Sequence, residues 1–506
     1  MRPRGDGLSK VGLLQLDPTV GDLEQNSHRL ARLAKQAEAA GAALGVSTEL
    51  AVCGYPPRDL LMERDFVERS MDVALNIPTD LPVLVGTPIP AEDDRTLPTN
   101  GVVRAGPQVA TITGDEHSRI VAEKQLLPTY DVFDEARYFA AKNRSGLARS
   151  IGGLTLGVTV CEDAWQSSGM TPSSYAQDPI EHIAGWCRQG VEINATVNLS
   201  ASPFHTDKFT TRLEVARHAA SVLNHPFLLA NQVGGNDDLL FDGRSLVAWP
   251  DGRAVVAPSW QEGVLMVDLD DPDACSWVSS TEVDALNVGE AELIVLEAGD
   301  DGSGLIETIE ELTNAVVSGL ADYCRKSSIR SVVLGLSGGI DSAVAACVAV
   351  AALGPSNVTG LAMPSRHSSN HSIDDAVHTA QALGMNHHLH EIDAMHTSVE
   401  NVLYDVLSNG HPVAGENLQS RLRAILVMGY ANANASMAIT TGNKSEIAQG
   451  YCTLYGDMAG GYAPLGDVYK MEVYAMAELF NQRTQGKGSP PPVSESTMTK
   501  PPSAEL

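Results

Sequence analysis

Positive charge is scarce in this sequence. Its 506 residues include 34 Lys and Arg against 63 Asp and Glu, which gives a formal net charge of −29. A surface of that charge repels phosphate backbones, and no basic patch is segregated along the chain. We therefore expect no nucleic-acid partner, and we take the acidity mainly as a sign of solubility.

Paired cysteines and long apolar runs are also missing. The seven cysteines are scattered without a CxxC pair, which argues against a disulfide framework or a zinc ribbon and favours a reducing cytoplasm. The opening MRPRGDGLSK has no apolar signal core, and the longest apolar run, 343–353, is far shorter than the roughly 20 residues of a membrane span. We expect a cytoplasmic protein with no membrane partner.

Length and pattern predict two α/β domains. A chain of 506 residues exceeds the roughly 100–200 residues of one ordinary domain. Short apolar strands alternate with amphipathic helices, and many strands end at polar residues, where open α/β sheets hold their chemistry. The run EAGDDGSGL then indicates a linker. We expect a first domain at 1–290, a linker at 291–305 and a second domain, a doubly wound parallel sheet, at 306–506.

The stretch SVVLGLSGGIDSAVAACVAV predicts a strand, a glycine-rich loop and a helix. Gly338 and Gly339 allow close approach to the backbone, and N–H groups at the helix start favour an anion. Ser337 and Ser342 add hydroxyl donors. No lysine follows the glycines, so this is not a Walker loop, and Asp341 beside phosphates requires a Mg²⁺ ion between them. We interpret the loop as a pyrophosphate site rather than a plain strand–helix turn.

Longer strings in the second domain carry a family resemblance. The loop LSGGIDSA resembles the PP-loop of N-type ATP pyrophosphatases, which split ATP between its α- and β-phosphates and adenylate a substrate. Farther on, ENLQSRLRAILVMGYAN and TTGNKSEIAQGYCTLYGDMAGGYAPLGDVYK resemble the signature of NAD synthetases. The resemblance implies an adenine nucleotide α-hydrolase-like fold, ATP and deamido-NAD⁺ as substrates, Mg²⁺, and no tightly bound organic cofactor.

The same resemblance implies roles for individual residues. Those matching the ATP site are Gly335, Leu336, Ser337, Gly338, Gly339, Ile340, Asp341, Ser342, Thr441 and Lys470. Those matching positions near deamido-NAD⁺ are Asn417, Glu446 and Asp457, and the matched Mg²⁺ ligands are Asp341 and Glu446. Adenylation needs a metal and cations to neutralise charge on the α-phosphate, so this set is chemically coherent. Any single member could be an ordinary surface residue, but their joint occurrence favours a site.

The first domain carries a second resemblance. A synthetase that makes an amide needs ammonia, which is scarce and mostly protonated near neutral pH. The strings STELAVCGYPPRDLL, EKQLLPTYDVFDE and GVTVCEDAW resemble the three blocks of the nitrilase (carbon–nitrogen hydrolase) superfamily. The resemblance implies an α-β-β-α sandwich and a glutaminase with the catalytic residues Glu49, Lys124 and Cys161.

Chemistry supports that set. A thiol with a pKa near ~8.5 needs a base, which Glu49 can supply to Cys161. Lys124 and the backbone N–H after Cys161 can stabilise the oxyanion, and a lysine beside the thiol also favours the thiolate. The alternative, a buried strand cysteine, fits poorly before the polar EDAW, whereas Cys53 has no such setting and is interpreted as structural.

Resemblance to the glutamine-dependent NAD synthetases also implies a glutamine pocket. We expect Lys208 to pair with the glutamine α-carboxylate. The residues implied for glutamine binding are Tyr55, Tyr130, Glu135, Ser202 and Lys208.

The chain departs from the family pattern in two places. Thr48 precedes the catalytic glutamate where relatives usually have Pro. Related chains continue beyond KPPSAEL with a segment containing basic residues, so the second domain is expected to lack roughly 40–60 residues, judged also against ordinary domain size. The Pro/Ser/Thr-rich end, 481–506, is expected to be mobile.

These resemblances imply a ligase that amidates deamido-NAD⁺ through an adenylate, with ammonia from glutamine; its products are NAD⁺, AMP, pyrophosphate and glutamate. They also imply a homodimer or larger homo-oligomer. One rival is another glutamine-dependent ATP pyrophosphatase, such as a GMP or asparagine synthetase, which shares only the loop. Another is a truncated chain that is an amidase alone or a silent nucleotide-binding subunit.

Overall fold

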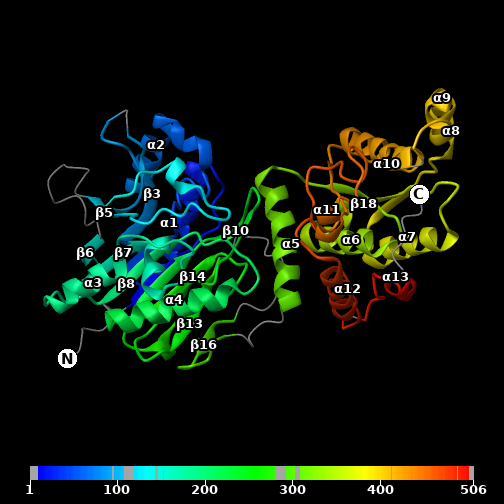
Figure 1. Ribbon diagram of the computed structural model, residues 1–506. Helices are drawn as coiled ribbons and strands as arrows, with labels where there is room; N and C mark the ends of the chain where they lie inside the picture. The colour runs from blue at the N-terminus through cyan, green and yellow to red at the C-terminus, as the bar shows by residue number, and fades with distance from the viewer. Residues whose placement is uncertain are drawn as a thin grey trace. The chain divides into compact units, whose positions relative to one another are not determined.

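The chain folds into two units, Met1–Leu305 and Ile306–Leu506 (Figure 1). Two parts of the expected linker, residues 291 and 303–305, lie outside the described residues, as do residues 487 and 501–506 of the expected tail. The computed structural model describes residues 10–93, 96–106, 119–142, 146–151, 153–280, 292–302, 308–411, 413–486 and 488–500.

The first unit is built on two seven-stranded mixed sheets. The first, in the order β15-β14-β1-β2-β3-β4-β5, consists of β15 (Ser276–Ser279), β14 (Gly263–Asp268), β1 (Lys10–Gln15), β2 (Leu44–Val46), β3 (Val83–Ile89), β4 (Thr99–Ala105) and β5 (Ile120–Glu123). The second, in the order β16-β13-β12-β9-β8-β7-β6, consists of β16 (Ile294–Leu296), β13 (Ala254–Val256), β12 (Leu246–Ala248), β9 (Phe227–Asn231), β8 (Ala195–Ser200), β7 (Leu154–Val160) and β6 (Gly146–Ile151). A separate hairpin joins β10 (Val233–Asn236) to β11 (Leu239–Asp242).

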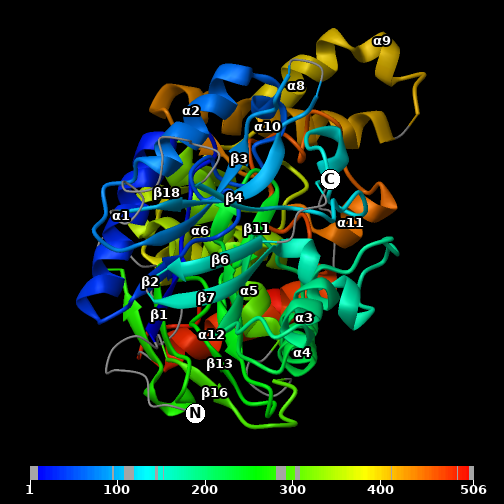
Figure 2. The ribbon, with the colours of Figure 1, turned by 90° about the vertical axis from the view of Figure 1, so that its left-hand side faces the viewer.

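Helices cover the outer faces of both sheets (Figure 2). The helices α1 (Leu23–Ala39) and α2 (Arg64–Leu75) pack on the first sheet, and α3 (Pro179–Arg188) and α4 (Lys208–Leu223) on the second. The central strands are buried on both faces and are rich in apolar residues, although β8 also buries the polar Thr196, Asn198 and Ser200. Apolar side chains of the two sheets share one core. The α-β-β-α sandwich predicted from the sequence is confirmed.

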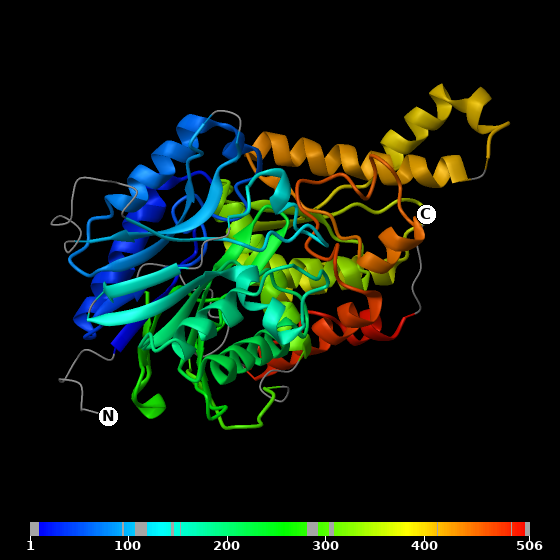
Figure 3. The same cartoon turned by 60° about the vertical axis from the view of Figure 1, so that its left-hand side comes forward.

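The second unit contains a four-stranded parallel sheet in the order β19-β18-β17-β20. Helix α10 packs on one face, and α6 and α7 pack against the central strands with α5 and α12 beside α6 (Figure 3). This is the predicted doubly wound sheet. Its elements are α5 (Thr308–Lys326), β17 (Val332–Gly335), α6 (Ile340–Leu353), β18 (Val358–Ala362), α7 (Asn370–Leu383), β19 (Asn386–Leu389), α8 (Asp393–Val402), α9 (Tyr404–Leu407), α10 (Val413–Asn434), β20 (Met437–Ala438), α11 (Lys444–Gln449), α12 (Lys470–Gln485) and α13 (Glu495–Thr499).

The expectation of a mobile tail is wrong for most of its described residues. Helix α12 continues to Gln485, and Ser494 caps α13 by accepting the Thr497 N–H. Asn481 also donates its Nδ2 to the Val493 carbonyl over 2.9 Å. Composition misled here because Ser and Thr serve as helix caps as readily as they serve flexible chain.

None of the helices within the described ranges combines the length and apolarity needed to cross a bilayer.

Candidate active sites

Strand β7 delivers Cys161 at its carboxyl end, where the short helix η5 (Cys161–Ala164) begins. Cys161 has a φ of +44°, which is unusual for a residue with a side chain and requires support from its surroundings. Neighbouring strands β7, β8 and β9 are parallel, so their carboxyl ends lie at one edge of the sheet. This edge is the kind of position at which α/β sheets expose reactive groups.

A buried ion cluster links residues of two of the nitrilase-like blocks. Lys124 and Glu49 are both fully buried, and Lys124 Nζ donates to Glu49 Oε1 over 2.7 Å and to Glu135 Oε1 over 2.8 Å. Asn100 Nδ2 donates to Glu49 Oε1 over 2.7 Å, and the Ala201 N–H donates to Oε2 over 3.0 Å. The Glu49 carboxylate therefore faces three donors that hold it in one orientation.

Burial sets the direction of the pKa shifts in this cluster. It raises the pKa of the Cys161 thiol well above its ordinary value, Glu49 raises it further, and Lys124 opposes both. Lys124 lowers the pKa of the thiol and so favours the thiolate as expected, but burial outweighs this effect and the net shift is upward. Burial likewise raises the pKa of Glu135 to about 7 against the lowering effect of Lys124. Nucleophile formation must accompany proton transfer to a neighbouring base.

The residues expected to bind glutamine divide into two groups. Tyr55 donates its hydroxyl to Glu135 Oε1 over 2.9 Å, so this pair belongs to the ion cluster. Tyr130 donates to Glu162 over 2.8 Å, beside Cys161. Ser202 follows the Ala201 amide and donates its own backbone N–H to Asn231 Oδ1 over 2.9 Å, and Lys208 Nζ lies 4.6 Å from the centre of the Trp165 ring.

In the second unit, the loop after β17 is held by its own hydroxyls. Ser342 Oγ donates to the Gly339 carbonyl over 2.9 Å and accepts the Ser337 N–H over 3.2 Å. Gly338 has a φ of +74°, and an added Cβ would lie 2.1 Å from the Ser372 carbonyl oxygen. Only glycine fits this position without a rearrangement. Helix α6 begins directly afterwards, so its first N–H groups face the loop.

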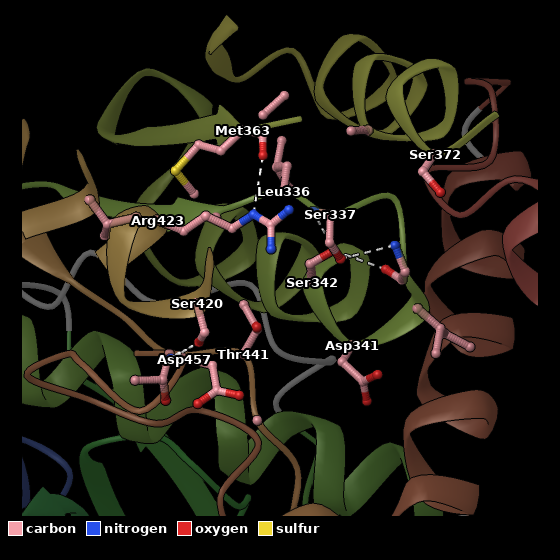
Figure 4. A pocket seen from close by; sticks show the side chains of 18 of the residues that line it. Leu336, Ser337, Asp341, Ser342, Met363, Ser372, Ser420, Arg423, Thr441 and Asp457 are labelled. Carbon is pink, nitrogen blue, oxygen red and sulfur yellow. Dashed lines mark hydrogen bonds between the residues drawn. The ribbon is translucent and has the colours of Figure 1, made fainter. Parts of the chain in front are cut away.

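A cavity of about 540 Å³ opens over this loop. Nine of the ten residues predicted for ATP line it, and Gly338 is the exception. Of the three predicted for deamido-NAD⁺, Glu446 and Asp457 line the cavity, whereas Asn417 accepts a hydrogen bond from Thr453 Oγ1 over 2.7 Å. Figure 4 shows Asp341 and Thr441 on one side of this space and the Arg423 side chain extending along another side.

The carboxylates in the cavity already have partners. Asp341 accepts hydrogen bonds from Asn443 Nδ2 over 2.8 Å and from Lys470 Nζ. Glu446 accepts the Asn443 N–H over 3.1 Å, and burial raises its pKa. Two carboxylates beside a phosphate-type loop offer the hard oxygen ligands that Mg²⁺ prefers, so the residues fit the expected ion. Within the described ranges, no group of three or more His, Cys, Asp or Glu side chains is arranged to hold a metal.

Several site residues escaped the sequence analysis. Asn100 reaches Glu49 from β4, and no local motif surrounds it. Arg423 lines the cavity from α10 and donates its Nε to the Met363 carbonyl over 3.1 Å. Lys500 lines the same cavity and donates to the Gly338 carbonyl over 2.8 Å. Arg423 lies within the string ENLQSRLRAILVMGYAN, and its place in that string is the one sequence signal that could have identified it as a site residue.

Comparisons with known proteins match each unit separately. A carbon–nitrogen hydrolase family model matches residues 10–278, and an NAD synthase family model matches residues 312–506. The fold and the two sites thus define a class: ligases that combine a carbon–nitrogen hydrolase with an ATP-using NAD synthase.

Relatives with the same two-part organisation extend over nearly the whole chain. A glutamine-dependent NAD(+) synthetase of Synechocystis sp. is 38% identical over 98% of this chain and 84% of its own length, and one of Rhodobacter capsulatus is 38% identical over 98% and 83%. The solved structure of glutamine-dependent NAD+ synthetase from Acinetobacter baumannii in complex with ADP matches with a TM-score of 0.80 and 30% identity, over 97% of this chain and 84% of that one. The chain belongs to the family of glutamine-dependent NAD(+) synthetases.

These matches also bear on the alternative functions considered from the sequence. They run through both units, which favours a two-site ligase over an amidase alone or a silent nucleotide-binding subunit. The relatives quoted above are NAD synthetases, and neither a GMP nor an asparagine synthetase is among them.

Proposed function

We propose that this chain makes NAD⁺ by ATP-dependent amidation of deamido-NAD⁺, with ammonia released from glutamine. The products are NAD⁺, AMP, pyrophosphate and glutamate. The observation that carries the proposal is the buried Lys124–Glu49 pair, with its 2.7 Å contact, in the same unit as the strained Cys161. A phosphate-type loop in the other unit supplies the second half of the reaction.

Glutamine hydrolysis begins with proton transfer from Cys161 Sγ to the Glu49 carboxylate. The thiolate attacks the side-chain amide carbon of glutamine, and Lys124 stabilises the negative oxygen that forms. Glu49 returns the proton to the leaving nitrogen, so ammonia departs and a thioester remains. Water then hydrolyses the thioester with Glu49 again as the base. Burial raises the pKa of the Cys161 thiol, so the transfer of its proton to Glu49 is part of forming the nucleophile.

Tyr55, Tyr130, Glu135, Ser202 and Lys208 would surround the glutamine. Burial lowers the pKa of the Lys208 ammonium. Its Nζ lies over the Trp165 ring, and a substrate carboxylate would supply the opposite charge for it. Tyr130, whose hydroxyl contacts Glu162 next to Cys161, and Ser202, which follows the Ala201 amide that contacts Glu49, would add polar groups to this pocket. We assign Lys208 to the glutamine α-carboxylate and Glu135 to holding Lys124.

In the second unit, the Ser337–Ser342 loop would hold the ATP phosphates. Asp341 and Glu446 would hold Mg²⁺, which when bound neutralises phosphate charge. Lys470 would leave Asp341 to face the α-phosphate as negative charge builds up during adenylate formation. Asn417, Glu446 and Asp457 are assigned to deamido-NAD⁺, whose activated carboxyl group then accepts ammonia.

An assay of the purified chain tests this function. With ATP, Mg²⁺ and deamido-NAD⁺, we expect NAD⁺ from either glutamine or ammonia, with one AMP per NAD⁺. Glutamate release without NAD⁺ would instead indicate an isolated amidase, and neither product would indicate a nucleotide-binding subunit. We also propose that ATP and deamido-NAD⁺ accelerate glutamine turnover; equal turnover with and without them would refute that coupling.

Two further assignments accompany the function. We propose a cytoplasmic location, on the basis of the scattered free cysteines. We also propose self-association into a homodimer or larger homo-oligomer, supported by exposed apolar side chains of the second unit such as Tyr404, Val406 and Ile425. Sedimentation of the purified chain measures the mass directly, and a monomer at micromolar concentration would contradict this assignment.

A further inference from the structure

A carboxylate outside the catalytic set joins two catalytic segments. Asp163 is 1% exposed and follows Cys161 by two positions. Its Oδ1 accepts the backbone N–H groups of Gln125 over 3.0 Å and Leu126 over 2.9 Å. Its Oδ2 accepts the N–H of Val160 over 3.1 Å. One side chain therefore satisfies three buried donors from two distant parts of the chain.

Those donors lie immediately beside the reacting groups. Gln125 and Leu126 directly follow Lys124, whose ammonium holds Glu49, and Val160 directly precedes Cys161. Because the two carboxylate oxygens serve different segments, any change in one hydrogen bond alters the spacing between the lysine and the thiol. Reaction rates are sensitive to such shifts, since a misplacement of about 1 Å can cost about 100-fold.

The backbone at Cys161 needs this kind of support. Its φ of +44° persists only where neighbouring groups fix the conformation. A second anchor acts on the other side of the residue, where Asn198 Nδ2 donates to the Cys161 carbonyl over 3.2 Å and to Thr159 Oγ1 over 3.0 Å. Asp163 thus holds the N–H of Val160, one residue before the nucleophile, and Asn198 holds the carbonyl of Cys161 itself.

We propose that Asp163, with Asn198 as its second anchor, is a positioning residue for glutamine hydrolysis that keeps the Cys161 thiol in register with Lys124 and Glu49. The inference rests on the proposed glutaminase function. It assigns no contact with substrate to either residue. Both act through the backbone of the catalytic segments.

The variant Asp163→Asn tests the inference most sharply. An amide has one acceptor oxygen, and its NH₂ group must face an N–H donor that the carboxylate formerly accepted. One catalytic segment is therefore released while volume is conserved. We expect kcat for glutamine hydrolysis to fall about 10- to 100-fold. The KM for glutamine should change less than about threefold, because the residues assigned to glutamine binding are untouched.

Glu262→Gln is the matched control. Glu262 is also a buried carboxylate of the first unit, 6% exposed, and its oxygens accept from Arg32 Nη2 over 2.6 Å and the Asp17 N–H over 3.1 Å. A general effect of altering a buried carboxylate would lower kcat in both variants. The positioning role predicts near wild-type kcat for E262Q, even if both variants lose similar thermal stability.

Alkylation of Cys161 by iodoacetamide, followed by peptide mass analysis, separates misplacement from misfolding. Unfolded molecules expose the thiol and add a separate phase of alkylation, whereas a misplaced thiol changes the rate constant of the folded molecules. If D163N does not fold, Asn198→Ala decides the matter, with a kcat loss of about tenfold at unchanged KM. The inference is overturned if folded D163N keeps the kcat and the alkylation rate of the wild type. If D163N does not fold, the same result for N198A overturns it. A wild-type chain that releases no glutamate would instead overturn the proposed function.

Discussion

Each unit pairs a lysine with a carboxylate at its candidate site, and the two pairs differ in exposure. Lys124 and Glu49 have no exposed side-chain surface, whereas the side chains of Lys470 and Asp341 are 25% and 19% exposed. The first pair sits within further buried hydrogen bonds from Asn100 and Ala201. The second opens onto a cavity of about 540 Å³.

This difference matches two kinds of chemistry. A buried pair is fixed before substrate arrives, which suits proton transfer among groups whose distances must not change. A partly exposed pair can exchange partners at lower cost, which suits a site where phosphates and a cation must enter between lysine and carboxylate. We infer that the glutaminase site is preorganised and that the nucleotide site rearranges on binding.

The largest expected effect is that of Lys124→Met. It leaves Glu49 and Glu135 buried without their cation, which costs about 3–5 kcal/mol of unfolding free energy. We expect glutamine hydrolysis to fall at least ~1000-fold, because oxyanion stabilisation is lost as well. Glutamate release and thermal unfolding measure the two effects. Retention of a tenth of the activity would contradict a preorganised cluster.

Lys470→Met is expected to act on the second pair, Lys470–Asp341, at the nucleotide site. Synthesis of NAD⁺ should fall about 100- to 1000-fold with either nitrogen donor, while unfolding changes by less than ~1 kcal/mol because the pair is partly exposed. Lys444→Met is the control, since its partner Asp467 is 98% exposed. A large loss of stability in K470M with normal NAD⁺ synthesis would contradict this account, because it would make the Lys470–Asp341 pair structural rather than functional.

Gly338→Ala should weaken nucleotide binding through the backbone. The added Cβ would meet the Ser372 carbonyl oxygen at 2.1 Å at a positive φ, so the loop must shift. Backbone strain of about 1–3 kcal/mol corresponds to a rise in the KM for ATP of about 5- to 150-fold. Gly429→Ala on α10 is the control, because a Cβ there meets nothing within 4 Å. Equal kinetics for the two variants would show that the loop tolerates the shift.

Lys500→Ala should give the smallest change. It removes the 2.8 Å hydrogen bond from Lys500 Nζ to the Gly338 carbonyl, and Thr497 Oγ1 still donates to that carbonyl over 3.3 Å. We expect a rise of about three- to tenfold in the KM for ATP, the effect of losing one hydrogen bond worth about 1 kcal/mol. An unchanged KM would mean that α13 only covers the loop.

Local strings predicted the fold class and the family, and both predictions are confirmed. Short motifs suffice to predict the fold class and the family because each reactive group has a fixed place beside a strand. Cys161 follows a strand, and Ser337–Ser342 lies between a strand and a helix. Candidate roles for individual residues, including Asn417 and Lys208, stay predictions. The predicted order of strand, glycine-rich loop and helix is also found, and α6 begins at Ile340, directly after Gly339.

Long-range contacts could not be predicted in the same way. Asn100 lies on β4 and Glu49 lies in the turn after β2, so their hydrogen bond depends on the order and register of strands that no local pattern encodes. The direction of the Cys161 pKa shift depends on burial, which outweighs the visible lysine. The cap at Ser494 and the contact from Lys500 to Gly338 arise from packing of a segment whose composition resembles flexible chain.

Cys161→Ala tests the division of labour most directly. Purified C161A should form NAD⁺ from ammonia at a rate within about twofold of wild type, because the nucleotide site contains none of the altered atoms. With glutamine as the only nitrogen source, it should form no NAD⁺ above background. Glutamine-supported synthesis at the wild-type rate would contradict the assignment of the thiol, and loss of both reactions in a folded variant would contradict the separation of the two sites.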